Sequence, residues 1–132
     1  MSVAASAPSS ANTARRAEPP WFHVHTVADR TAEDLIRVLR LGFAVGVVRS
    51  RGPVPTTAGV LAFLRRWPAM RAHGRVEYLG SSRPRLVVEG IECDLEGHSA
   101  NHRAALRSDF ECFCRHATDY IDTVEYLYAR WT

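Results

Sequence analysis

The chain has 132 residues, of which 46% are hydrophobic and 23% are charged, and its formal net charge is +3. This length and composition are typical of one globular domain that buries a real core. The longest apolar run, residues 41–48, is far shorter than the roughly 18 residues that a membrane-spanning helix needs. We therefore expect no transmembrane segment and no membrane partner.

Residues 1–20 are rich in Ala and Ser and end in two prolines, which predicts a disordered leader before a single domain over residues 21–132. Arg15 and Arg16 are not followed by an apolar segment, so a twin-arginine signal is excluded. An organelle transit peptide stays an alternative, because the first 17 residues contain Ser and Arg but no acid. Three irregularly spaced cysteines indicate a reducing compartment, and we expect a cytoplasmic protein.

The first half of the domain predicts two strands and two helices. Residues 21–27 are aromatic and β-branched, so we expect a strand there. Thr31 is a predicted N-cap of a helix that stops near Gly42, and residues 43–48 predict a short buried strand. Residues 49–55 predict a loop, after which Thr56 or Thr57 caps a helix that ends before Pro68.

The second half predicts a hairpin, a long helix and a last strand. The hairpin strands are expected at residues 75–79 and 85–91, with a turn over residues 80–84. Ser99 begins the longest helix, whose apolar stripe is Leu106, Phe110, Phe113 and Ala117. Residues 123–131 alternate well and predict a final strand.

The resulting order is β-α-β-α-β-β-α-β, which predicts a single compact domain of the α+β class. Two helical crossovers imply β-α-β units with their helices packed on one sheet. A split β-α-β, ferredoxin-like plan with an additional central helix fits this order best.

The charges of the chain are unevenly distributed. Residues 35–76 contain no Asp or Glu but eight arginines, whereas the last 47 residues contain nine carboxylates and four arginines. Such segregation attracts anions or an acidic partner to the basic part. We expect the binding residues to be Arg37, Arg40, Arg49, Arg51, Arg65 and Arg66. Because the chain has no Lys at all, the choice of Arg at one position carries little weight.

Three kinds of partner fit this pattern. The favoured one is an acidic protein surface, and the function is then that of a non-catalytic interaction or regulatory module. A nucleic acid is the alternative, since arginines contact phosphates and Tyr78, Tyr126 and Tyr128 could stack on bases. The acidic C-terminal part also allows a homodimer in which the basic and acidic faces meet.

Catalytic and metal-ligating motifs are weak. His23 and His25 alternate along the first predicted strand, which leaves a small cofactor-free enzyme as a further alternative. The pairs His98/His102 and Cys112/His116 each have helical spacing. His102 and Cys112 would lie about 15 Å apart along one helix, so the two pairs cannot share one metal ion. We expect no metal site, no cofactor and no catalytic residue.

Overall fold

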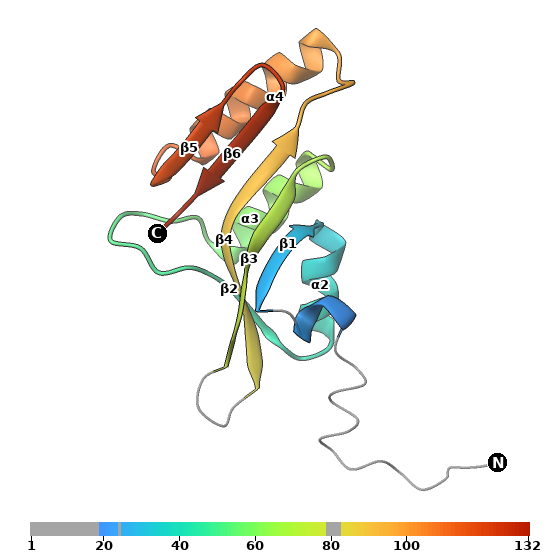
Figure 1. Cartoon of the computed structure of the whole chain (residues 1–132), viewed down its shortest axis with the longest axis vertical. Coiled ribbons are helices and arrows are strands. Elements are labelled where there is room, and N and C mark those ends of the chain that lie inside the picture. Colours follow the sequence, from blue (N-terminus) through green and yellow to red (C-terminus); the bar gives the residue numbers. More distant parts are fainter. Residues whose placement is uncertain (1–18, 24, 79–82) are drawn as a thin grey trace, which may run out of the picture.

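The computed structural model describes residues 19–23, 25–78 and 83–132, and they form an α+β domain (Figure 1). The elements in chain order are the 3-10 helix η2 (Pro20–His23), β1 (Thr26–Arg30), α2 (Ala32–Arg40), β2 (Ala44–Val47), α3 (Thr57–Arg66), β3 (Arg71–Tyr78), β4 (Pro84–Asp94), α4 (Ala100–Phe113), β5 (Asp119–Asp122) and β6 (Tyr126–Arg130). The predicted α+β class is confirmed. The expected leader, except its last two residues, and residues 80–82 of the expected turn lie outside the described residues. No helix in the described ranges is long and apolar enough to cross a membrane.

The long strand β4 organises the six-stranded sheet. One edge of β4 pairs antiparallel with the whole length of β3. The other edge pairs first with β2, in parallel, and then with β6, antiparallel. β1 extends the sheet beyond β3, and β5 extends it beyond β6. Two different strands therefore pair with the same edge of β4: β2 pairs with its first half and β6 with its second half.

The crossovers differ from the predicted ferredoxin-like plan, which is not confirmed. The strands joined by α2, β1 and β2, run in the same direction, but two strands, β3 and β4, separate them in the sheet. The strands joined by α4, β4 and β5, are also parallel, and β6 separates them. Each crossover is thus a split β-α-β unit, and the first spans one strand more than a ferredoxin-like unit does.

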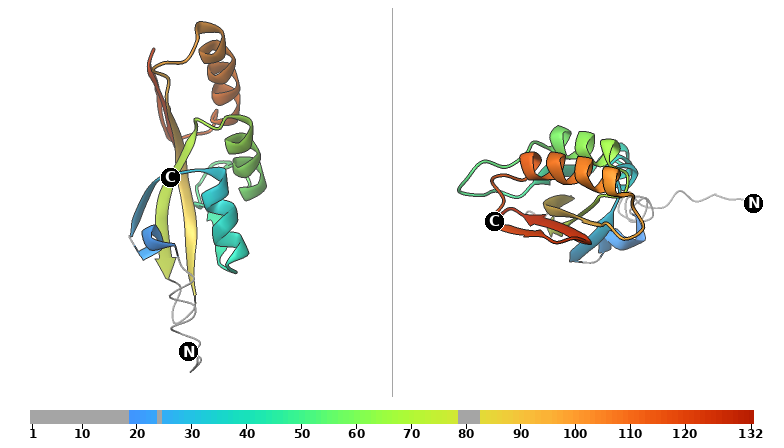
Figure 2. Two further views of the ribbon diagram at one scale, coloured as in Figure 1. Left: turned by 90° about the vertical axis from the view of Figure 1, so that its right-hand side faces the viewer. Right: turned by 90° about the horizontal axis from the view of Figure 1, so that it is seen from above.

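All three α-helices cover one face of the sheet, and the opposite face carries no α-helix but has the short 3-10 helix η2 on its side (Figure 2). Apolar side chains that alternate along the strands fill the space beneath the helices, among them Val76 of β3, Ile91 of β4 and Leu127 of β6. Leu106 and Phe110 of α4 are fully buried against them. This period of two gives the sheet one buried and one open face.

The predicted helix starts are confirmed, because each rests on local chemistry. Thr31 Oγ1 accepts from the Asp34 amide at 3.2 Å, and Asp34 accepts from the Thr31 amide at 2.9 Å, which forms a capping box. Thr56 and Ser99 cap α3 and α4 through their side-chain oxygens, each accepting from the amide three residues later. Gly42 follows α2 with φ +88°, a conformation that suits glycine.

Two expected strands need correction. Residues 21–23 and 25 are not in a strand, because Pro19 and Pro20 start a 3-10 turn in which the Phe22 amide donates to the Pro19 carbonyl at 2.9 Å. Phe22 is completely buried in this turn and contacts the ring of Phe43. The last expected strand is shorter, and β5 before it was not predicted, since all four β5 residues are exposed and lack an apolar alternation.

Candidate functional site

The structure places the six arginines expected to bind a partner at three separate positions. Arg37 and Arg40 lie in the last turn of α2, Arg49 and Arg51 in the loop after β2, and Arg65 and Arg66 in the last turn of α3. All six are exposed. In Figure 1 the loop projects on the left of the molecule, whereas α2 lies on the right. They therefore do not form one continuous patch.

Two further arginines, Arg83 and Arg85, lie against β2 and the residues just before it, which belong to the segment 35–76 that contains no Asp or Glu. Arg83 lies over the ring of Phe43, with Cζ 4.8 Å from the ring centre, and its Nη2 reaches the carbonyl of Leu41 at 3.5 Å. Arg85 lies against Gly46, because a Cβ built on that glycine would be 3.1 Å from Arg85 Nη2. Sequence reasoning missed both, since they follow Glu77 and so fall outside the acid-free window.

The region around β2 is consequently basic. Arg40 and Arg49 lie shortly before and after β2 in the chain, and Arg83 and Arg85 lie against it. Within the described part of the chain, none of these four guanidinium groups forms an ion pair. Arg66, in contrast, is 3.1 Å from Asp109 and is partly neutralised. We call the free side of β2 together with Arg40, Arg49, Arg83 and Arg85 the β2 edge.

No described strand pairs with the side of β2 that faces away from β4. The amide of Val48 donates to Val88 of β4 at 2.8 Å, and in a parallel ladder alternate residues bond to the same neighbour. Val45 and Val47 therefore direct their backbone groups away from β4. Thr57 Oγ1 reaches the Val45 carbonyl from that side at 3.2 Å, and no described strand pairs there. The amide of Val45 and both backbone groups of Val47 thus lie on the side of β2 with which no described strand pairs.

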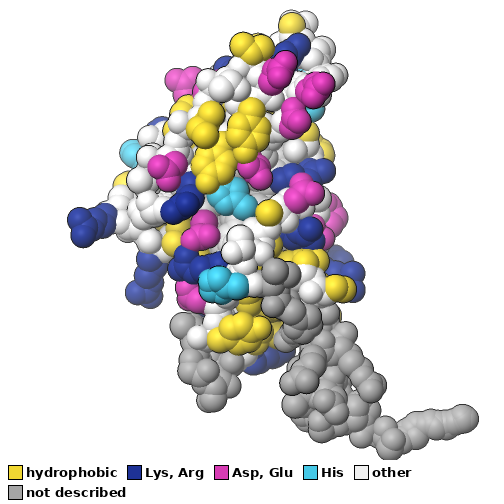
Figure 3. Space-filling view, viewed as in Figure 1, with side chains coloured by type: hydrophobic (Ala, Val, Ile, Leu, Met, Phe, Trp, Pro, Cys, Tyr) yellow, Lys and Arg dark blue, Asp and Glu magenta, His cyan; other side chains and the backbone are white. Residues whose placement is uncertain are grey.

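The open face of the sheet carries a row of three rings. His73 of β3 and Tyr128 of β6 have ring centres 5.1 Å apart, and Tyr126 follows Tyr128 at 6.4 Å. Figure 3 shows apolar side chains and a histidine gathered over this part of the sheet. The neighbouring strand β4 places Glu92 beside Tyr128 and Asp94 beside Tyr126.

These carboxylates decide what the tyrosines can contact. The Tyr126 hydroxyl donates to Glu92, and burial together with this hydrogen bond raises the pKa of Tyr126. A phosphate backbone following bases stacked on these rings would approach Glu92 and Asp94, which repel it. Tyr78, the third tyrosine expected to stack, is 59% exposed at the end of β3. The ring row therefore gives no support to nucleic-acid binding.

The charged centre of the open face is neutralised internally. Arg75 of β3 donates to Glu77 at 2.9 Å and also to Glu89 of β4. The hydrogen bond to Glu77 is the main cause that raises the pKa of Arg75 further above its ordinary value. A guanidinium held by two carboxylates stabilises the sheet and has little charge left for a partner.

The histidines do not assemble the expected pair. His23 is the last residue of η2 and His25 precedes β1, so they do not alternate along one strand, and the His25 side chain is exposed. His98 and His102 stack with ring centres 4.8 Å apart. Across the described ranges, no group of three or more His, Cys, Asp or Glu side chains is arranged to hold a metal ion.

Comparisons with models of protein families, with curated proteins and with solved structures found no match to this chain. The geometry of its surfaces is therefore the guide to its function. Among these, the β2 edge combines open backbone groups with positive charge that no described carboxylate offsets.

Proposed function

We propose that the protein is a non-catalytic interaction module that binds an extended acidic segment of a partner protein at the β2 edge. The observation that carries this proposal is the free edge of β2 between arginines that have no described carboxylate partner. An extended peptide adds to an exposed edge strand through main-chain hydrogen bonds. The bound segment would pair with Val45 and Val47.

Charge selects the partner. Arg83 and Arg85 hold two positive charges against β2, and Arg40 and Arg49 add two more near its ends. Carboxylates spaced along an extended segment would meet these guanidinium groups, and bidentate pairs with Arg are the geometrically specific ones. A neutral or basic strand would find the same backbone groups but would leave the arginines without partners. The charge thus favours acidic segments and disfavours a second basic edge.

The test is a binding titration with a short peptide of alternating Glu and Val, followed by amide shifts in NMR spectra. We expect the shifts to concentrate at Val45 and Val47 and the affinity to fall with added salt. A double variant, Arg40→Glu with Arg49→Glu, should weaken binding about tenfold or more. The matched control, Arg65→Glu with Arg115→Glu, changes the net charge equally at exposed sites and should bind almost as well as the native protein.

Further experiments distinguish strand addition from the other ways of binding. A peptide with N-methylated backbone keeps every carboxylate but cannot donate to a strand, so we expect it to bind much more weakly. Equal binding of that peptide, or equal losses in the two double variants, would contradict strand addition. Tighter binding of a single-stranded or duplex nucleic acid would favour that alternative instead. A molar mass in light scattering that falls from dimer to monomer with salt would favour the homodimer.

A further inference from the structure

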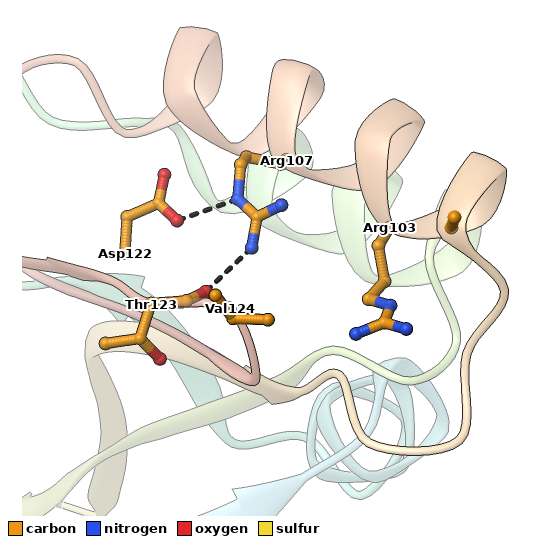
Figure 4. A pocket seen from close by; sticks show the side chains of 6 residues that line it. Arg103, Arg107, Asp122, Thr123 and Val124 are labelled. Carbon is orange, nitrogen blue, oxygen red and sulfur yellow. Dashed lines mark hydrogen bonds and ion pairs between the residues drawn. The ribbon is translucent and has the colours of Figure 1, made fainter.

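A pocket separates the first turns of α4 from the turn between β5 and β6, away from the β2 edge (Figure 4). Its volume is about 380 Å³, and its lining is Ala100, Arg103, Arg107, Asp122, Thr123 and Val124. Ligand pockets of proteins start at roughly 300 Å³, so the space suits a small molecule rather than a chain.

Arg107 forms one wall and is held in place. Its Nε donates to Asp122 Oδ1 at 2.7 Å, and its Nη2 donates to the carbonyl of Thr123 at 2.7 Å. In Figure 4 no dashed line joins the third nitrogen of this guanidinium to a partner, and this nitrogen points along α4 toward Arg103. The Asp122 carboxylate fixes the group but leaves one donor directed into the pocket.

Arg103 lies one helical turn earlier on the same face of α4. Among the described residues, its buried Nε has no hydrogen-bond partner, and no carboxylate forms an ion pair with it. Figure 4 shows its terminal nitrogens extending from the helix into the pocket, on the opposite side from Val124.

The pocket therefore holds two positive charges and one negative charge. Like charges four residues apart on a helix destabilise it, and the amino end of α4 at Ala100 adds further positive potential. A compact anion between Arg103 and Arg107 would remove the repulsion and supply an acceptor to both groups. Val124, which is 72% exposed, gives the other wall an apolar surface.

We propose that this pocket binds a small organic anion, with its carboxylate or phosphate between Arg103 and Arg107 and a short apolar part against Val124. The anionic head accepts from the terminal nitrogens of Arg103 and from the third nitrogen of Arg107. The apolar part covers Val124 and the methyl group of Ala100.

Titrations with pentanoate, pentyl phosphate and 1-pentanol at constant ionic strength test the proposal. Both anions should shift the NMR signals of Ala100 and Val124, with dissociation constants of about 1–10 mM for ligands this small. The tighter of the two identifies the preferred head group. Pentanol has the same apolar part but no charge and should not saturate the site. Pentanol binding equal to that of the anions, or no shift at up to about 50 mM anion, overturns the proposal.

Variants locate the anion. Arg103→Gln should weaken binding of the better anion at least about tenfold, because it removes a charge-assisted donor. Arg103→Lys keeps the charge and should retain part of the affinity. The matched control is Arg115→Gln, an exposed arginine just beyond the end of α4, which should bind like the native protein. Circular dichroism confirms that each variant is folded. Native affinity in a folded Arg103→Gln variant contradicts the assignment.

Discussion

The imidazole of His73 lies parallel to the ring of Tyr128, within 6° and with the ring centres 5.1 Å apart, although β4 separates their two strands. The residue between them is Gly90, which pairs with His73 on one side and with Arg130 on the other. A side chain at this position would occupy the space of the imidazole. The contact therefore depends on the absence of a Cβ at Gly90.

Substitution of Gly90 by Ala should destabilise the fold. The new Cβ would lie 2.1 Å from the carbonyl oxygen of Ala129 and 2.5 Å from Cε1 of His73. The imidazole can move, but the carbonyl belongs to the β6 ladder and cannot. We expect a loss of about 2–3 kcal/mol in the free energy of unfolding, measured by urea denaturation.

Gly52→Ala is the matched control, because a Cβ at Gly52 meets nothing within 4 Å. It should change the stability by less than about 0.5 kcal/mol. Equal stabilities of the two alanine variants would show that β4 and β6 separate more easily than this packing implies.

Acidification should weaken the native state through His73. Burial is the main cause that lowers the pKa of His73 below its ordinary value of 6.5, and nearby Glu92 and Glu89 oppose this effect only in part. The unfolded chain then binds the proton more readily than the folded chain. The stabilisation is fully present above pH 6.5 and is lost as the pH falls toward the lower pKa that His73 has in the folded protein.

Urea denaturation at pH 7, 6 and 5 measures this effect. The native protein should lose more stability over this range than His73→Gln, with a difference of at most about 1.4 kcal/mol per pH unit. Titration of the imidazole protons by NMR provides a direct check. A midpoint above 6.5 for His73 would mean that the carboxylates outweigh burial, and the pH dependence would reverse.

The sequence predicted the helix starts correctly, because the residues that determine each start lie within one short segment. Thr31, Thr56 and Ser99 each cap a helix through an amide three residues later, so a single short segment contains the whole signal. β5 has no such signal, because its exposed residues form a strand only by pairing with β6.

The candidate sites depend on contacts between distant segments. Arg103 and Val124 face one pocket, and Arg85 meets Gly46, in each case across more than 20 residues of chain. Charge counting found the basic segment but not Arg85, which follows Glu77 and meets that segment only through the pairing of β4 with β2. A glycine within a strand was the one visible hint of close approach at Gly46 and Gly90.

Asp109 links α3 to α4, and its removal should loosen the two helices. Its Oδ2 accepts from the indole Nε1 of Trp67 at 3.0 Å and lies 3.1 Å from Arg66 Nε. Asp109→Ala leaves a part-buried indole N–H without an acceptor, so we expect a loss of about 1–2 kcal/mol. Asp109→Asn keeps an acceptor and loses only an exposed ion pair, which costs about 0.5 kcal/mol.

Urea denaturation followed by tryptophan fluorescence measures both Asp109 variants. The control is Asp119→Ala, which removes an exposed ion pair to Arg130 at 3.8 Å and should be nearly neutral. If the Asn variant were as unstable as the Ala variant, the ion pair rather than the indole hydrogen bond would hold the helices together.

Alkylation should distinguish one cysteine from the other two. Cys112 is exposed, whereas Cys93 and Cys114 are buried. Burial raises the pKa of Cys93 to about 11 and that of Cys114 to about 12, so both remain protonated thiols at pH 8. Iodoacetamide at pH 8 should therefore add one group to the folded protein, at Cys112, and three groups in urea, as measured by mass spectrometry. Rapid modification of Cys114 under native conditions would show that the end of α4 opens from the sheet, because only that motion exposes this sulfur.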